Sequence, residues 1–237
     1  MTSLQIEGLK VDRSGIAVIR GVDLVAQSGE ISVLLGSNGA GKTTLLESLS
    51  GIIPSRAGSI SLNGVELARL RPGTRAKAGI SHVEQGRTVF SDMTTEENLK
   101  VALHEEADLS DAYDLFPELL QRRNVKTGML SGGEQQMVVI ARSIVNRPRV
   151  IMIDEMSSGL APVIVNRLMR AVRKLADSGM AVILVEQFAS LALSIGDRAY
   201  VLRRGEIVYD GGCKTLADDP ALMHRLYLGE GEKAAAL

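Results

Sequence analysis

Short apolar runs alternate with longer stretches of helical spacing along this chain of 237 residues. Three of the runs are four or five residues long and almost wholly apolar, which is typical of strands buried on both faces of a sheet. These runs span 31–35, 150–153 and 181–185. Apolar residues at helical spacing occur at 42–49, 131–146 and 162–176. The alternation predicts an α/β fold, in which helices cover both faces of a mostly parallel core sheet.

Mixed patterns of apolar and polar residues predict further strands at 4–11, 17–24, 59–62 and 79–83. Asn63-Gly64 directly follows the third of them and is typical of a hairpin turn, so we expect an antiparallel β-subdomain there. A second hairpin is predicted over 198–208, with its turn at Arg204-Gly205. The terminal residues 229–237 are expected to be frayed.

Between residues 92 and 123 the chain becomes acidic, with Lys100 almost alone among the carboxylates. The acidic residues are Glu96, Glu97, Glu105, Glu106, Asp108, Asp111, Asp114 and Glu118. Leucines recur among these charges, so we expect a small α-helical lobe with an acidic outer face. This face is either simply solvated or the docking surface of a partner protein.

Composition and charge restrict the class of protein. A chain of this length can bury one substantial core and a small appended lobe, so we expect a single domain over 1–237. A formal net charge of −1 without a basic stripe argues against nucleic acid as a partner. The single cysteine, Cys213, excludes an intrachain disulfide. We find no signal-peptide pattern and no apolar run of membrane-spanning length, so work at a membrane requires another subunit.

Residues 36–44, GSNGAGKTT, match the phosphate-binding pattern G-x-x-x-x-G-K-[ST] between a predicted strand and a predicted helix. Backbone N–H groups at such a helix start are unpaired and attract anions, and glycines let the backbone wrap around a phosphate. Lys42 is expected to reach the β- and γ-phosphates, and the Thr43 hydroxyl to bind Mg²⁺. The predicted triphosphate ligands are Gly36, Ser37, Asn38, Gly39, Ala40, Gly41, Lys42, Thr43 and Thr44.

Two adjacent carboxylates, Asp154 and Glu155, directly follow the apolar run 150–153. Downstream of a phosphate loop, the first acid is suited to hold Mg²⁺ through water. The second acid is suited to orient and polarise an attacking water. Together with the loop, these residues predict that the bound triphosphate is hydrolysed.

A second glycine-rich helix start occurs at 130–136, LSGGEQQ. Ser131 and Glu134 fit a capping box, which accounts for these two residues without any ligand. A capping box does not account for Gly132 and Gly133, because each glycine costs about 1 kcal/mol against alanine in a helix. Glycines there let an anion approach bare N–H groups, so we predict a second phosphate site that has no lysine of its own.

These three motifs together resemble those of the ATP-binding-cassette (ABC) ATPases: GSNGAGKTT the phosphate loop, VIMIDE the strand with the catalytic acids, and LSGGEQQ the signature motif. The resemblance implies the P-loop NTPase fold of ABC ATPases, with ATP and Mg²⁺ as cofactors. It also implies a head-to-tail dimer, in which residues 131–134 of one subunit cover the γ-phosphate held by the other. We expect a catalytic core at about 1–85 and 148–237, and a helical lobe with the signature motif at about 86–147.

Further family positions can be assigned residue by residue. Gln85 resembles the glutamine that contacts Mg²⁺ and the membrane partner, and 158–161 resembles the loop that crosses the dimer interface. Gln187 stands where the family usually has a switch histidine. An amide can donate a hydrogen bond to the γ-phosphate but carries no proton at pH 7, which makes Glu155 the main water-polarising group. The family's adenine-stacking aromatic is missing, and Arg13 either replaces it by a cation–π contact or is solvated.

Within the family, the chain resembles the LivF-type ATPases of branched-chain amino acid importers over nearly its whole length. The likeness is carried by VFSDMTTEENL, SSGLAP, VEQ at the switch position and the terminal YLG. ATPases of urea importers are similar, and residues 83–87 lie between the two patterns. The resemblance implies ATP-driven import at the cytoplasmic face of the cell membrane. The implied partners are integral-membrane permease subunits, a second ATPase that is LivG-like or identical, and, indirectly, a periplasmic or extracellular solute-binding protein.

Two other classes of cassette protein stay open. A soluble cassette that acts on DNA or ribosomes, or that scaffolds another assembly, is disfavoured by the short acidic lobe between Gln85 and Ser131, where such a protein would carry a long coiled-coil insertion. A regulatory subunit that binds ATP without hydrolysing it is suggested by Gln187 and opposed by Glu155.

Overall fold

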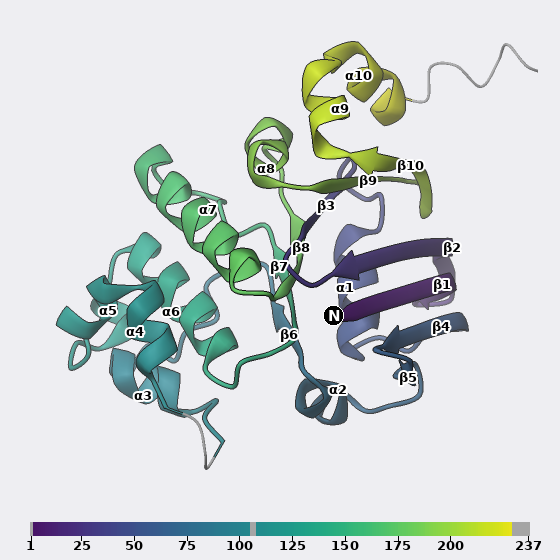
Figure 1. Ribbon diagram of the computed structural model, residues 1–237. Helices are drawn as coiled ribbons and strands as arrows, with labels where there is room; N and C mark the ends of the chain where they lie inside the picture. Colours follow the sequence, from purple (N-terminus) through teal and green to yellow (C-terminus); the bar gives the residue numbers. More distant parts are fainter. Residues whose placement is uncertain (1, 105–107, 229–237) are drawn as a thin grey trace, which may run out of the picture.

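Two β-sheets form the centre of the molecule, which the computed structural model describes over residues 2–104 and 108–228 (Figure 1). The larger sheet has the strand order β10-β9-β3-β8-β7-β6. All neighbours in it pair in parallel except β10, which is antiparallel to β9. The strands are β3 (Ile31–Leu35), β6 (Ile80–Val83), β7 (Val150–Asp154), β8 (Ala181–Val185), β9 (Arg198–Arg203) and β10 (Glu206–Gly212). The expected frayed tail 229–237 and the carboxylates Glu105 and Glu106 lie outside the described residues.

The smaller sheet is antiparallel, in the order β2-β1-β4-β5, and confirms the predicted β-subdomain. Its strands are β1 (Ser3–Arg13), β2 (Ile16–Gln27), β4 (Ala57–Leu62) and β5 (Val65–Glu66). Asn63 and Gly64 both have positive φ angles, of 53° and 80°, as the two-residue hairpin turn requires.

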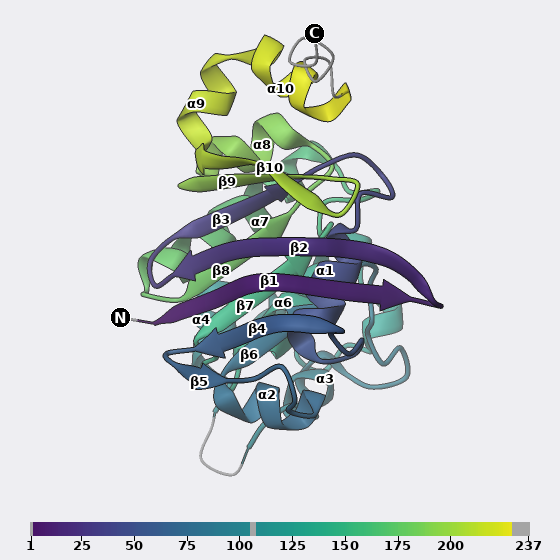
Figure 2. The same ribbon diagram turned by 90° about the vertical axis from the view of Figure 1, so that its right-hand side faces the viewer.

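The core lies on both faces of the parallel sheet, which explains why its central strands are apolar throughout. Val33 and Ile153 belong to a buried cluster with helices α6 and α7 on one face. Leu34 and Met152 belong to a second cluster with α1 and the antiparallel sheet on the other face. Helix α1 therefore lies between the two sheets, as Figure 2 shows. These helices are α1 (Lys42–Ser50), α6 (Gly132–Ile144) and α7 (Pro162–Asp177).

A group of helices lies on the side of the core sheet away from the antiparallel sheet (Figure 1). It comprises α3 (Thr95–Lys100), α4 (Ser110–Leu115), α5 (Pro117–Gln121) and α6. The three short helices pack against α6 through buried residues such as Leu99, Leu115 and Leu119. The helices expected between 92 and 123 are therefore present. The division of the chain at about 85 and 147 stays a prediction.

The sequence pattern does not predict four short helices, α2 (Pro72–Ala78), α8 (Ala189–Ile195), α9 (Cys213–Asp218) and α10 (Pro220–Leu228). Helices this short depend on tertiary packing, which a local pattern does not show. In α2, the buried Arg75 donates to the carbonyls of Ser48 and Leu49 at distances of 2.6 and 2.9 Å. These carbonyls belong to the last turn of α1, so α2 satisfies the carboxyl end of that helix.

Candidate nucleotide site

The phosphate loop joins β3 to α1, and its glycines are required by the chain around it. Gly36 has a φ of 153°, and a Cβ there would lie 2.3 Å from the Leu202 carbonyl oxygen of β9. A Cβ on Gly41, which precedes α1 with a φ of 112°, would lie 2.9 Å from Cδ1 of Ile19. No side chain caps this helix, and no acceptor among the described residues pairs with the N–H groups of 41–44. The loop therefore presents bare donors to an anion.

Lys42 begins α1 and points back into the loop, with only 7% of the residue exposed. Its Nζ donates to the carbonyls of Gly36 and Ser37 at 2.8 and 3.3 Å. Burial lowers the pKa of Lys42, while the nearby carboxylates Glu155 and Asp154 raise it. The amine is thus held beside the bare N–H groups, where it can bind a phosphate.

Asp154, at the end of β7, carries a buried carboxylate that lacks hydrogen bonds. The residue is 1% exposed, and neither oxygen has a partner of good geometry within the described part of the chain. Burial raises the pKa of Asp154, while the Thr43 hydroxyl and Lys42 lower it. An orphaned carboxylate beside a hydroxyl fits a hydrated Mg²⁺. In the described residues, no group of three or more His, Cys, Asp or Glu side chains could hold a metal ion by itself, so water or phosphate oxygens would be needed as further ligands.

Glu155 follows with a φ of 48°, an uncommon value for a residue other than glycine. Its N–H donates to the Val185 carbonyl at 3.0 Å, which continues the pairing of β7 with β8. Its carboxylate accepts a hydrogen bond of 2.7 Å from Nε2 of Gln85, which follows β6. The fold therefore brings together two residues that lie 70 positions apart in the chain. Gln187 follows β8 at the same edge of the sheet, with an exposed side chain.

The second glycine-rich helix start forms the predicted capping box at the beginning of α6. Ser131 Oγ accepts from the Glu134 N–H at 3.3 Å, and Glu134 Oε2 accepts from the Ser131 N–H at 2.9 Å. The other oxygen of Glu134 pairs with Arg122 at 3.2 Å. Both oxygens of Glu134 thus have protein partners, and its contact with a nucleotide stays a prediction. The N–H groups of Gly132 and Gly133 have no acceptor among the described residues.

Arg87 is a residue that sequence analysis did not place in the site. Its Nη2 donates to the carbonyls of Ser158 and Gly159 at 3.3 and 3.4 Å. A Cβ on Gly132 would lie 2.7 Å from the Arg87 Cζ. The guanidinium therefore lies against the first signature glycine and holds the loop after Glu155. Its position two residues after Gln85 was the available signal, because both belong to one loop.

Each signature glycine also has a packing neighbour. A Cβ on Gly133 would lie 2.6 Å from Cγ2 of Ile164 in α7, as one on Gly132 would meet Arg87. The sequence motif alone suggests only anion binding as the reason for both glycines. At Gly133 the structure adds a steric reason that is independent of any ligand, whereas at Gly132 the neighbour is the flexible end of Arg87.

Arg13 at the end of β1 has a partner in the chain. Its Nη1 lies 2.7 Å from the carboxylate of Glu47 and 3.3 Å from the hydroxyl of Thr44, both on α1. The guanidinium is therefore not merely solvated, although about half of this side chain is exposed, at 51%. Its contact with adenine stays a prediction.

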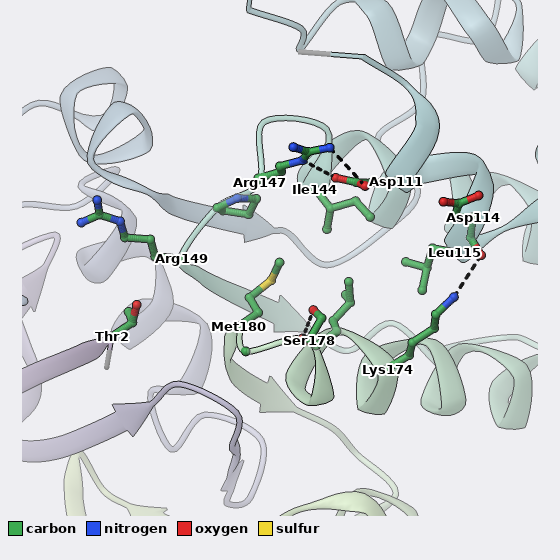
Figure 3. Close-up of a pocket in the computed structure, with 13 residues that line it drawn as sticks. Thr2, Asp111, Asp114, Leu115, Ile144, Arg147, Arg149, Lys174, Ser178 and Met180 are labelled. Carbon is green, nitrogen blue, oxygen red and sulfur yellow. Dashed lines mark hydrogen bonds and ion pairs between the residues drawn. The ribbon is translucent and has the colours of Figure 1, made fainter. Parts of the chain in front are cut away.

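Two hollows differ in what lines them. One of about 430 Å³ lies between Gln85, Arg87, Glu155 and the signature helix residues Gln135 and Gln136. The other, of about 510 Å³, lies at the opposite ends of the core strands (Figure 3). Its lining includes Asp111, which pairs with Arg147, and the basic residues Arg149 and Lys174. The second hollow shares no lining residue with the nucleotide site.

Comparison with known proteins identifies the family. A family model described as ABC transporter matches residues 19–158. The chain is 40% identical to the high-affinity branched-chain amino acid transport ATP-binding protein BraG of Pseudomonas aeruginosa, over 86% of this chain and 90% of that protein. It is 37% identical to a probable branched-chain amino acid transport ATP-binding protein, LivF, of Archaeoglobus fulgidus, over 83% and 86% of the two chains. The chain therefore belongs to the ABC transporter family, as an ATPase subunit whose ATP hydrolysis is coupled to transport.

Other relatives show how widely this cassette is used. The lipopolysaccharide export system ATP-binding protein LptB of Escherichia coli is 33% identical, over 97% of this chain and 98% of LptB. A solved ATP-binding subunit of an ABC transporter superposes with a TM-score of 0.81 at 26% identity, over 95% and 98% of the two chains. A nucleotide-free cassette gives a TM-score of 0.84 at 23% identity, over 94% and 98%, which supports the fold alone. No helix in the described ranges is long and apolar enough to cross a membrane.

Proposed function

We propose that this chain is the ATP-hydrolysing subunit of an importer for branched-chain amino acids. The observation that carries this proposal is the 40% identity with BraG, over 90% of that protein. The likeness to LptB, whose name describes export, is lower at 33%. The solute is selected by other subunits, so the argument for amino acids rests on similarity and not on the site.

The proposed hydrolysis assigns one task to each residue of the site. Lys42 and the bare N–H groups of the loop bind the β- and γ-phosphates. Thr43, Asp154 and Gln85 would hold Mg²⁺, which would supply positive charge against the negative charge that develops on the phosphate oxygens. Glu155 orients the attacking water and accepts its proton, while the Gln187 amide donates a hydrogen bond to the γ-phosphate.

We also propose that the site is completed by a second cassette, either another copy of this chain or a LivG-like ATPase. Ser131, Gly132 and Gly133 of one subunit then approach the γ-phosphate bound by the other. The support is the pair of bare N–H groups at the start of α6, with the Arg87 guanidinium beside them. Arg13, which contacts Glu47 and Thr44 on α1, is proposed to contact the adenine as well.

The remaining partners follow from the import proposal. Integral-membrane permease subunits would hold the chain at the cytoplasmic face of the membrane, and an external solute-binding protein would deliver the amino acid to them. Gln85 is proposed to connect the permease with Glu155, because its amide already contacts that carboxylate.

The test has a biochemical and a transport arm. Affinity-tagged protein should co-purify with integral-membrane subunits, whereas soluble partners or nucleic acid alone would refute a transporter role. A strain that lacks the gene should lose uptake of radiolabelled leucine and keep uptake of urea. Wild-type protein should restore leucine uptake, and the Glu155→Gln variant should not. Loss of urea uptake instead would replace the amino-acid proposal with a urea importer.

A further inference from the structure

A buried carboxylate outside the predicted site lies between the two loops that carry Glu155 and Gln187. Glu186 follows β8, directly before Gln187, and only 2% of it is exposed. Its Oε2 accepts a hydrogen bond from the Ser157 hydroxyl at 2.5 Å, and its Oε1 accepts from the Ser157 N–H at 3.2 Å. Ser157 lies two residues after Glu155 and is equally buried.

The sheet register explains why these loops meet. Strands β7 and β8 are parallel neighbours, with Asp154 opposite Val185 at their ends. The Glu155 N–H extends this pairing by donating to the Val185 carbonyl at 3.0 Å. The segments that follow β7 and β8 therefore leave the sheet side by side. The contact of Ser157 with Glu186 then joins these two segments.

A carboxylate is a costly side chain for this position. Burial raises the pKa of Glu186, while the hydroxyl and N–H of Ser157 and the Gln187 N–H lower it. No ion pair with Lys or Arg is found for it among the described residues. Burying a charge without a counter-ion is unfavourable unless several donors satisfy it. Both hydrogen bonds to the carboxylate come from Ser157 in the other loop, so Glu186 fixes one loop relative to the other.

We propose that Glu186 is a positioning residue for hydrolysis, which holds Glu155 and Gln187 in a fixed relation by binding Ser157. The proposal rests on the roles given above to Glu155 and Gln187. Ser157 also precedes the loop 158–161, which is assigned to the interface with the second cassette. A displacement of that loop by the partner is therefore transmitted through Ser157 and Glu186 to Gln187.

The experiment measures kcat and KM for ATP with the purified full-length chain. Ser157→Ala removes the hydroxyl, and Glu186→Gln replaces one acceptor oxygen with a donor. We expect each variant to lower kcat by about 10-fold, which corresponds to about 1.4 kcal/mol of lost transition-state stabilisation. The KM should stay within about 2-fold, because neither residue contacts the nucleotide. The double variant should be no slower than the worse single variant, since both remove one contact.

Two controls separate positioning from a loss of folding. Ser157→Thr keeps the hydroxyl and should retain kcat within about 3-fold of wild type. Thr127→Val removes a different buried hydroxyl, which donates to the Phe90 carbonyl at 2.8 Å in the helical lobe. It should lower the Tm to a similar degree as Ser157→Ala, with kcat unchanged.

The proposal is overturned if Ser157→Ala and Glu186→Gln lower the Tm but leave kcat within about 2-fold. It is also overturned if the two effects multiply in the double variant. Failure of the import proposal would appear separately, as normal ATP turnover without leucine uptake. Full activity of Glu155→Gln would instead remove the catalytic assignment on which this inference rests.

Discussion

The two glycine-rich helix starts, at α1 and α6, differ in what each leaves unpaired. At α1 no side chain caps the helix, the N–H groups of 41–44 are bare, and Lys42 lies beside them. At α6 the capping box of Ser131 and Glu134 satisfies part of the first turn, while the N–H groups of Gly132 and Gly133 have no acceptor within residues 2–104 and 108–228. The first start leaves its donors open to an anion, whereas the second is capped by the chain itself.

This difference indicates how one site can be shared by two subunits. A helix start whose N–H groups are paired only by a phosphate is suited to bind the nucleotide of its own subunit. The start of α1 is of this kind. A helix start that is already capped can be exposed on a free subunit and still accept a phosphate brought by another. The guanidinium of Arg87 beside Gly132 supplies positive charge there without a lysine.

The largest effect is expected from removing the cation at α1. Lys42→Ala should weaken ATP binding by about 100-fold or more, because charge-assisted hydrogen bonds to phosphate contribute about 1.5–3 kcal/mol each. Isothermal titration calorimetry with ATP measures the change. The matched control is Lys174→Ala in the second hollow, which should bind ATP normally. Unchanged affinity of Lys42→Ala would refute the phosphate-loop assignment.

The next effect separates capping from phosphate binding at α6. Asp and Asn are both good N-caps, so Ser131→Asp and Ser131→Asn should keep the Tm of the wild type. Only the aspartate places a negative charge where the γ-phosphate should arrive, so its ATP turnover should fall at least about 10-fold below that of Ser131→Asn. ATP affinity of the separate chain should be equal in both. Equal turnover in the pair would mean that α6 binds no phosphate.

A pH-dependent effect is expected at the carboxyl end of α1. His82 Nδ1 lies 3.2 Å from the Ser50 hydroxyl, and burial lowers the pKa of His82 to about 4, against the raising effect of Glu47. As the pH falls, His82 takes up a proton in the unfolded chain, where its pKa is the ordinary 6.5, before it does so in the folded chain. The contribution of neutral His82 to the free energy of unfolding is therefore complete above pH 6.5, and it is lost as the pH falls from 6.5 towards 4.

At about pH 5 this loss amounts to about 2 kcal/mol of the free energy of unfolding. Urea unfolding at about pH 7.5 and about pH 5 should show it in the wild type, and His82→Gln should lack this component. Substitution of the exposed His224 by glutamine serves as the control and should behave as the wild type. In hydrogen exchange at the lower pH, α1 should lose protection before α6. Equal pH dependence of wild type and His82→Gln would contradict the assignment.

The smallest effect concerns the contact of Arg87 with Gly132. In the wild-type chain, Gly132→Ala should gain less than the usual helix advantage of alanine over glycine, because the new Cβ would lie 2.7 Å from the guanidinium carbon and Arg87 would have to shift. In an Arg87→Ala background the same change should be more favourable by about 0.5–1 kcal/mol in urea unfolding. Additive effects would show that the guanidinium does not lie against this glycine.

The fold and the phosphate loop could be predicted because their causes are local. The apolar runs at 31–35, 150–153 and 181–185 follow from burial on both faces of a parallel sheet. Gly41, Lys42 and Thr43 occupy fixed positions in a continuous motif. The capping box at Ser131 also lies within four consecutive residues, and the structure contains it as predicted.

The contacts between loops could not be predicted, because their partners are distant in the chain. Ser157 and Glu186 are separated by 29 positions, and Arg87 and Ser158 by 71. Neither pair forms a spacing motif, and the parallel register alone brings the first pair together. Arg75 was missed for the same reason, since its role is to bind carbonyls of α1 that precede it by 26 and 27 positions.

The association state of Glu155→Gln with ATP tests most directly whether two subunits share the site. This variant should bind ATP without hydrolysing it, so the closed state should accumulate. Sedimentation of the purified variant in ATP and Mg²⁺ should give about twice the 25.4 kDa mass of one chain. If the partner is a different ATPase, the complex with the membrane subunits should instead contain one additional cassette. The Glu155→Gln/Ser131→Asp variant should bind ATP and remain unpaired. An ATP-saturated Glu155→Gln chain that never acquires a second cassette, alone or in that complex, would contradict the shared site.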